Sequence, residues 1–263
     1  MLPTPSTTHI NPSRTYEPAE DSYLVLDTLS STSQKTYLQT RFPTKTTTTT
    51  PTPTPLILEL GTGSGVVLAF LNAHATTIFG RPDILTLGID VSDYACQATQ
   101  ETVRLATATE SQKSNGGVGF FTAAVRADLT SSLLDGQVDV LVFNPPYVPT
   151  ESLPAAVFAE DEDGMPLSPQ QSFERDSRLL ELTYAGGVDG MEVTGRLLEV
   201  LPRVLSARGL AFVLLCAQNR PREVAAKVRD WTGGGWEAEI VGSSGMKAGW
   251  EKLCILRIAR VVE

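Results

Sequence analysis

The 263-residue chain has few of the residues that usually bind metals. It contains only two histidines, His9 and His74, and three cysteines, Cys96, Cys216 and Cys254, with no C-x-x-C pair. Protein zinc sites cluster Cys and His at short spacing, so we expect no metal site in this chain. An odd number of separated cysteines suits a reducing compartment. A Ser-His-Asp hydrolase is also disfavoured, because no G-x-S-x-G motif is present.

Basic residues and long apolar runs are scarce as well. Lys and Arg number 21 against 30 Asp and Glu, which gives a formal net charge of −9. Lys and Arg drive binding to bare phosphate backbones, so direct nucleic-acid binding is not expected. No stretch approaches ~20 uninterrupted apolar residues, and the N-terminus lacks the apolar segment of a secretory signal. We therefore expect no membrane insertion and a location in the cytoplasm or the nucleus.

Low-complexity composition separates the core-forming part of the chain from the rest. Residues 1–14 are rich in Thr, Pro and Ser and are expected to be a disordered tail, followed by a single domain over residues 15–263. The Thr/Pro run at residues 44–55 cannot pack a core and is predicted to be a solvated loop. A polar stretch at residues 150–170, with an acidic run at 160–163, is predicted to be a second loop near the functional site.

From residue 56 onward, apolar segments of strand length alternate with segments of helix length. Strands are predicted at residues 56–60, 85–90, 119–129, 138–146, 210–216, 237–242 and 252–260. Helices are predicted at residues 16–30, 64–79, 92–110, 171–183, 191–206 and 220–232. This alternation indicates an α/β fold with a mainly parallel sheet and helices on both faces. Ligands of such sheets bind at the carboxyl ends of the strands, so the turns after the first four strands should converge on one site.

A glycine-rich turn, E-L-G-T-G-S-G, follows the first predicted strand at residues 59–65. Glycines let the backbone turn tightly into a helix and approach a ligand closely. The spacing matches neither the Walker A loop nor G-x-G-x-x-G. Asp90 ends the next strand, where an acid can bind ribose hydroxyls, and Asp128 ends the third. The combination favours a bound adenosine over a turn with a purely structural role.

The most specific motif is Asn144-Pro145-Pro146-Tyr147, directly after the fourth strand. An amide or aromatic amine nitrogen is a poor nucleophile because its lone pair is delocalised. The Asn144 side-chain oxygen and the Pro145 carbonyl can accept both N–H bonds of an NH₂ group and aim its lone pair at an electrophile. The prolines stiffen the loop, and Tyr147 can pack against the planar group. A proline turn that merely ends a strand is the alternative interpretation.

Taken together, these motifs resemble the HemK-type protein glutamine methyltransferases, and more narrowly their short eukaryotic branch without a separate N-terminal substrate domain. The resemblance covers most of residues 16–260. The segments that carry it are YEPAED (16–21), ELGTGSG (59–65), Asp90, ADL (127–129), FNPPY (143–147) and AGGVDGMEV (185–193). It implies a Rossmann-like, seven-stranded class I methyltransferase fold with an antiparallel last strand pair. The implied substrate is the glutamine of a Gly-Gly-Gln tripeptide in a translation release factor, methylated on its side-chain amide.

The resemblance also implies roles for individual residues. The implied cofactor is S-adenosylmethionine, converted to S-adenosylhomocysteine, with no metal. The implied cofactor-binding residues are Tyr16, Glu20, Ser22, Glu59, Gly61, Thr62, Gly63, Gly65, Asp90, Val91, Asp128, Leu129 and Asn144. The implied catalytic residues are Asn144, Pro145, Pro146 and Tyr147. Within this set Asp90 would hold the ribose hydroxyls, and Asp128 would meet the adenine amine with Leu129 beside the ring.

Two parts of the resemblance leave alternatives open. Tyr16, Glu20 and Ser22 would close over the cofactor, but capping and packing roles explain them equally well. The Thr/Pro loop and the long acidic stretch depart from the family pattern, and the acidic stretch borders the expected site.

Members of the eukaryotic branch work as heterodimers with a small zinc-binding activator protein, and one segment fits such a partner. In the implied strand order the third strand lies at an edge, and its first part, Gly119–Val125, carries no charge. An exposed apolar edge invites strand addition, and a partner strand would cover it. Coverage by the chain's own tail is the alternative.

Other acceptors and one non-enzymatic role remain open at this point. The N-P-P-Y motif is shared with adenine-N(6) methyltransferases, although the negative net charge weighs against a nucleic-acid substrate that must be presented as a flipped base or a single strand. An acidic rim could attract a basic histone tail for lysine methylation, which the planar geometry of N-P-P-Y suits less well. A cofactor-free scaffold is disfavoured, because both the cofactor turn and the N-P-P-Y turn are intact.

Overall fold

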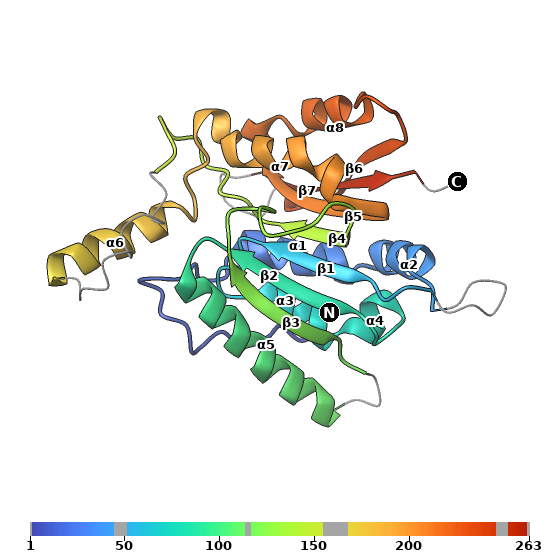
Figure 1. Ribbon diagram of the computed structural model, residues 1–263, viewed down its shortest axis with the longest axis horizontal. Helices are drawn as coiled ribbons and strands as arrows, with labels where there is room; N and C mark the ends of the chain where they lie inside the picture. The colour runs from blue at the N-terminus through green and yellow to red at the C-terminus, as the bar shows by residue number, and fades with distance from the viewer. Residues whose placement is uncertain (1, 45–51, 114–116, 155–167, 246–251, 262–263) are drawn as a thin grey trace.

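A seven-stranded sheet with the order β3-β2-β1-β4-β5-β7-β6 forms the centre of the domain (Figure 1). The computed structural model describes residues 2–44, 52–113, 117–154, 168–245 and 252–261. The strands are β1 (Leu56–Leu60), β2 (Leu85–Asp90), β3 (Phe120–Arg126), β4 (Val138–Phe143), β5 (Leu205–Cys216), β6 (Trp236–Ser243) and β7 (Leu253–Arg260). The pairs among β1 to β5 are parallel, and β7 runs antiparallel to both β5 and β6. The predicted Rossmann-like, mostly parallel sheet is confirmed.

Helices cover both faces of this sheet (Figure 1). They are α1 (Glu20–Ser30), α2 (Thr32–Arg41), α3 (Val66–Ala73), α4 (Ala75–Phe79), α5 (Asp93–Lys113), α6 (Pro169–Glu181), α7 (Glu192–Val204) and α8 (Pro221–Arg229), with short 3-10 helices at Val188–Gly190 and Ala217–Asn219. Successive side chains of a strand point to opposite faces. Accordingly Val140 and Val142 of β4 pack with α1 to α4, whereas Leu141 and Phe143 pack with α7 and α8.

Sequence patterning misses α2 and misplaces several element boundaries. The α2 sequence is largely polar and buries only Gln34 and Leu38, so it lacks an apolar stripe. Its start is fixed instead by Ser31, whose side chain accepts a hydrogen bond from the Gln34 N–H. The helix predicted at residues 64–79 is two helices that meet at His74. Strand β5 begins at Leu205, inside the helix predicted to reach residue 206.

The N-terminal segment departs from the expectation of a disordered tail. Residues 2–14 lie against the domain, where the carbonyl oxygen of Pro3 is 2.9 Å from Nε2 of His74. Arg14 donates to Asp176 of α6 at 2.8 Å. Backbone carbonyls and isolated side chains make these contacts, and a Thr/Pro-rich composition does not reveal them.

The two predicted loops are described only in part. Of the Thr/Pro run at residues 44–55, positions 45–51 lie outside the described residues, and the hydroxyl of Thr52 accepts a hydrogen bond from the buried Arg81 at 2.8 Å. Of residues 150–170, positions 155–167 with the whole acidic run lie outside the described residues. Within the described ranges, the helices are too short or too polar to span a bilayer.

Candidate active site

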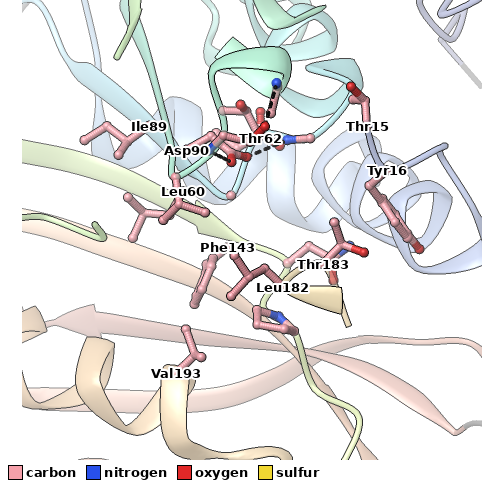
Figure 2. A pocket seen from close by; sticks show the side chains of 18 of the residues that line it. Thr15, Tyr16, Leu60, Thr62, Ile89, Asp90, Phe143, Leu182, Thr183 and Val193 are labelled. Carbon is pink, nitrogen blue, oxygen red and sulfur yellow. Dashed lines mark hydrogen bonds between the residues drawn. The ribbon is translucent and has the colours of Figure 1, made fainter. Parts of the chain in front are cut away.

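A pocket opens at the carboxyl ends of β1, β2 and β4, where the predicted turns converge (Figure 2). Leu60, Ile89 and Phe143 form an apolar wall, and Val193 of α7 lies beyond Phe143. The segment before α1, including Tyr16, lines the other side. Ligand sites of α/β sheets lie at such crevices, so the fold itself explains why residues distant in sequence meet here.

The glycine turn needs glycine because neighbouring residues leave little room for a β-carbon, and because its backbone has positive φ. Gly65 has φ +75°, and a β-carbon there would lie 2.5 Å from Cα of Thr99 on α5. Gly63 has φ +50° and lies against Tyr16, whose Cβ would be 3.3 Å from an added β-carbon. The turn therefore leads directly into α3 while keeping its backbone close to the pocket.

Two buried carboxyl groups, Glu59 and Asp90, anchor this turn. Glu59 accepts the Leu68 N–H at 2.8 Å and so caps the first turn of α3. Burial raises the pKa of the Glu59 carboxyl well above its ordinary value. Asp90 accepts the N–H groups of Gly63 at 3.0 Å and Ser92 at 2.9 Å, and burial raises its pKa. A carboxylate offers about four acceptor positions, so Asp90 is held rigidly with capacity left for ribose hydroxyls.

The side-chain amide of Asn144 is oriented by a carboxylate. Its Nδ2 donates to Oδ2 of Asp21 at 2.8 Å, and the Tyr16 hydroxyl donates to the same oxygen at 2.8 Å. Only the NH₂ end of an amide can donate, so this bond decides which way the group faces. Oδ1 of Asn144 is buried and has no hydrogen-bond partner among the described residues. A buried acceptor without a partner is costly, which indicates that a ligand N–H completes it.

The A-G-G-V-D-G-M-E-V segment, residues 185–193, packs closely against the backbone of the N-P-P-Y turn. A β-carbon at Gly186 would lie 2.7 Å from the Pro146 carbonyl oxygen, and one at Gly190 would collide with the Tyr147 carbonyl. Asn219 is buried, and its Nδ2 donates to the Tyr147 carbonyl at 3.4 Å. The two motifs, about 40 residues apart in sequence, therefore form one rigid unit.

Most of the predicted cofactor-binding residues do line the pocket. They are Tyr16, Ser22, Glu59, Gly61, Thr62, Gly63, Asp90, Val91, Asp128, Leu129 and Asn144. Two of the predicted residues are not among the lining residues. Glu20 is exposed at the first position of α1. Gly65 shapes the turn through its positive φ and its contact with Thr99.

Of the four predicted catalytic residues, two line the pocket and two do not. Asn144 and Pro146 line the pocket, whereas Pro145 is buried outside its lining. Tyr147 packs against the core cluster on the α1 face of the sheet. The ring is only partly buried there, so its packing against a substrate amide stays a prediction.

Sequence reasoning missed three charged residues that line the pocket: Arg14, Asp21 and Arg196. Arg196 of α7 pairs with Asp128, and this pairing leaves acceptor capacity on the Asp128 carboxylate for the adenine amine. Asp21 could have been found from helical spacing, because Val25 is four residues on and both are buried on one face of α1.

Comparisons with known proteins are consistent with this geometry. No family model matches the chain. The fission yeast Schizosaccharomyces pombe "eRF1 methyltransferase catalytic subunit mtq2" is 30% identical over 265 residues, covering 99% of this chain and 97% of that protein. The chain belongs to the HemK-type methyltransferase family. "Methyltransferase HEMK2" of Mus musculus is also 30% identical, over 98% of this chain and 97% of the mouse protein, and the human protein of that name is 30% identical over 93% and 89%.

The pocket of this HemK-type methyltransferase fits S-adenosylmethionine, its cofactor. Asp90 suits the ribose diol, and the apolar residues beside Leu129 suit the adenine ring. Across the described ranges, His, Cys, Asp and Glu form no cluster of three or more that could hold a metal ion.

Proposed function

We propose that this chain methylates the side-chain amide nitrogen of the glutamine in the Gly-Gly-Gln tripeptide of a translation release factor. The observation that carries the proposal is Oδ1 of Asn144, a buried acceptor without a partner in the described structure, at the wall of the cofactor pocket. A planar NH₂ group supplies the N–H that this oxygen needs. The name of the fission yeast relative, an eRF1 methyltransferase subunit, supports the same choice of substrate.

In the proposed reaction the protein acts mainly by positioning. S-adenosylmethionine supplies a methyl group on a sulfonium, and the chain must bring the amide nitrogen in line with it. Asn144 Oδ1 accepts one N–H bond of the substrate amide, which orients the NH₂ group at the wall of the cofactor pocket. Well-oriented reactants gain ~7–11 kcal/mol in this way. The proton leaves the nitrogen after transfer, when the nitrogen has become acidic, so no strong general base is required.

The pocket walls protect this geometry from water. Leu60, Phe143 and Val193 close the pocket on the sheet side, and Leu182 and Thr183, just after α6, lie beside Phe143 (Figure 2). Excluding water strengthens the hydrogen bonds that hold the substrate amide.

A labelled methyl-transfer assay tests the proposed substrate. The chain, co-expressed with its activator, would be offered intact release factor beside a variant with the Gly-Gly-Gln glutamine changed to alanine. We expect label on the first and none on the second. Asn144→Ala should lower the rate at least about a hundredfold, in line with the loss of one positioned hydrogen bond in a catalytic site. Equal labelling of both release factors would contradict the proposal.

We also propose that a small zinc-binding activator protein pairs with the free edge of β3. The support is the surface of that strand: Phe120 is 61% exposed and Val125 37% exposed, and Phe120 to Val125 carry no charge. The described part of the N-terminal segment leaves Phe120 uncovered, which disfavours coverage by the chain's own tail. Co-purification of a tagged activator with the untagged chain tests this pairing, and separate elution of the two at micromolar concentration would contradict it.

A further inference from the structure

We propose that Asp21 is a positioning residue: its carboxylate holds the Asn144 amide so that the oxygen, and not the NH₂ group, faces the substrate nitrogen. The inference rests on the proposed function of the pocket and assigns a new residue to it. Asp21 lies in the second position of α1, 123 residues before Asn144 in the sequence.

The carboxylate of Asp21 is itself fixed on both oxygens. Oδ2 accepts from Nδ2 of Asn144 and from the Tyr16 hydroxyl, each at 2.8 Å. Oδ1 accepts the Ser22 N–H at 2.6 Å. Asp21 is only 4% exposed, so water does not compete for these bonds. A negative charge in the first turn of a helix is also favoured by the helix dipole.

These hydrogen bonds disfavour the alternative orientation of the Asn144 side-chain amide, in which its oxygen and its NH₂ group exchange places. If the Asn144 side chain rotated by 180°, its oxygen would face the Asp21 carboxylate, and two acceptors would meet without a proton between them. The NH₂ group would then point into the pocket and could not accept an N–H from the substrate. A hydrogen bond to a charged group shifts such an equilibrium by about 10- to 100-fold. Asp21 therefore keeps Asn144 in the productive state before the substrate arrives.

Asp21→Ala removes this control and should lower kcat about 10- to 100-fold. The KM for S-adenosylmethionine should change much less, because the residues that surround the glycine turn and Asp90 remain. Asp21→Asn should recover much of the lost kcat, since its side-chain oxygen can still accept from Asn144. The matched control is Asp27→Ala, which removes an exposed acid from the same helix and should leave kcat unchanged.

A purely structural role for Asp21 predicts a different pattern. It would lower the melting temperature of both Asp21 variants while leaving kcat per folded molecule near the wild-type value. That result, with wild-type enzyme active on the release factor, would overturn the positioning role and leave the proposed function standing. An inactive wild-type enzyme would instead contradict the proposed function.

A readout that needs no substrate keeps the inference testable in either case. Nitrogen-15 NMR of the complex with the activator, with the Asn144 side-chain signal assigned by its loss in Asn144→Ala, reports exchange of the NH₂ protons with water. Asp21→Ala should speed this exchange about 10- to 100-fold, and Asp27→Ala should not change it. Unchanged protection in Asp21→Ala would overturn the inference.

Discussion

The edge strand β6 exposes Glu237 and Glu239 beside Ile240, whereas the opposite edge strand, β3, exposes Phe120 and Val125 and carries no charge from Phe120 to Val125. Both strands contain one register irregularity against their neighbours, so the difference lies in the side chains. Proteins usually protect a free edge with charge, and β6 follows this rule. The same sheet therefore carries charge at the β6 edge and leaves uncharged, apolar side chains exposed at the β3 edge.

The two edge strands also differ in their contacts with neighbouring strands and helices. Glu239 of β6 accepts from Arg257 of β7 at 2.7 Å, and Gly242 lies directly against Thr28 of α1. Strand β3 contacts α5 on one face, and in the described part of the chain no strand pairs with its outer backbone edge (Figure 1). Strand β6 therefore has both an ion pair to β7 and a close contact with α1.

Among the substitutions at the two edges, Phe120→Lys on β3 should have the largest effect, and the quantity it lowers is the affinity for the activator. An aromatic side chain at the centre of an interface commonly contributes ~2–4 kcal/mol, so the affinity for the activator should fall at least about 30-fold. The matched control is Ile240→Lys on β6, which is 40% exposed and should leave the affinity unchanged. Titration calorimetry with the purified activator measures both. Normal co-purification of Phe120→Lys would show that β3 is not the docking edge.

Gly242→Ala tests how strongly β6 is tied to α1. The added methyl group would collide with the Thr28 hydroxyl, so the helix or the strand must move. We expect a loss of about 1–2 kcal/mol in the free energy of unfolding, measured by urea denaturation. Gly195→Ala in α7 is the control, because a β-carbon there has open space and should improve helix propensity. Equal stability of wild type and Gly242→Ala would show that this contact is loose.

Glu239→Val should have the smallest effect on the fold and a selective effect on association. Glu239 is exposed, and Arg257 keeps its hydrogen bond to Gln34, so the unfolding free energy should fall by no more than about 1 kcal/mol. The β6 edge would then resemble β3, and sedimentation velocity should detect self-association that rises with concentration. Glu223→Val on α8 is the control, since it removes an exposed acid away from the edge. A monomeric Glu239→Val would show that charge is not what protects β6.

The parts of the fold that sequence patterning predicts well are those with continuous apolar runs. The strands β1, β2 and β7 lie within one residue of their predicted limits because buried strands consist of apolar residues that turns interrupt. Helix α2 was missed because its position depends on a cap at Ser31 and on two buried residues rather than on a stripe. Boundaries governed by single hydrogen bonds leave little trace in composition.

The same division applies to the site. The glycine turn and the N-P-P-Y turn are visible in the sequence because their chemistry demands particular residues in adjacent positions. The hydrogen bond between Asp21 and Asn144 is not visible, because it joins two residues that lie 123 positions apart in the sequence. The pairing of Arg196 with Asp128 likewise depends on how α7 packs beside the end of β3.

The sequence alone determined that this protein is an α/β domain, and it predicted an adenosine pocket and a turn suited to hold an amide, since local backbone demands and strand patterns are encoded by neighbouring residues. Only the tertiary structure decided that Asp21 orients Asn144, that Tyr147 packs partly against the core, and that residues 2–14 lie against the domain. Each of these depends on which groups from distant segments share one buried space. These contacts form only when folding brings the distant segments together, so the local sequence does not reveal them.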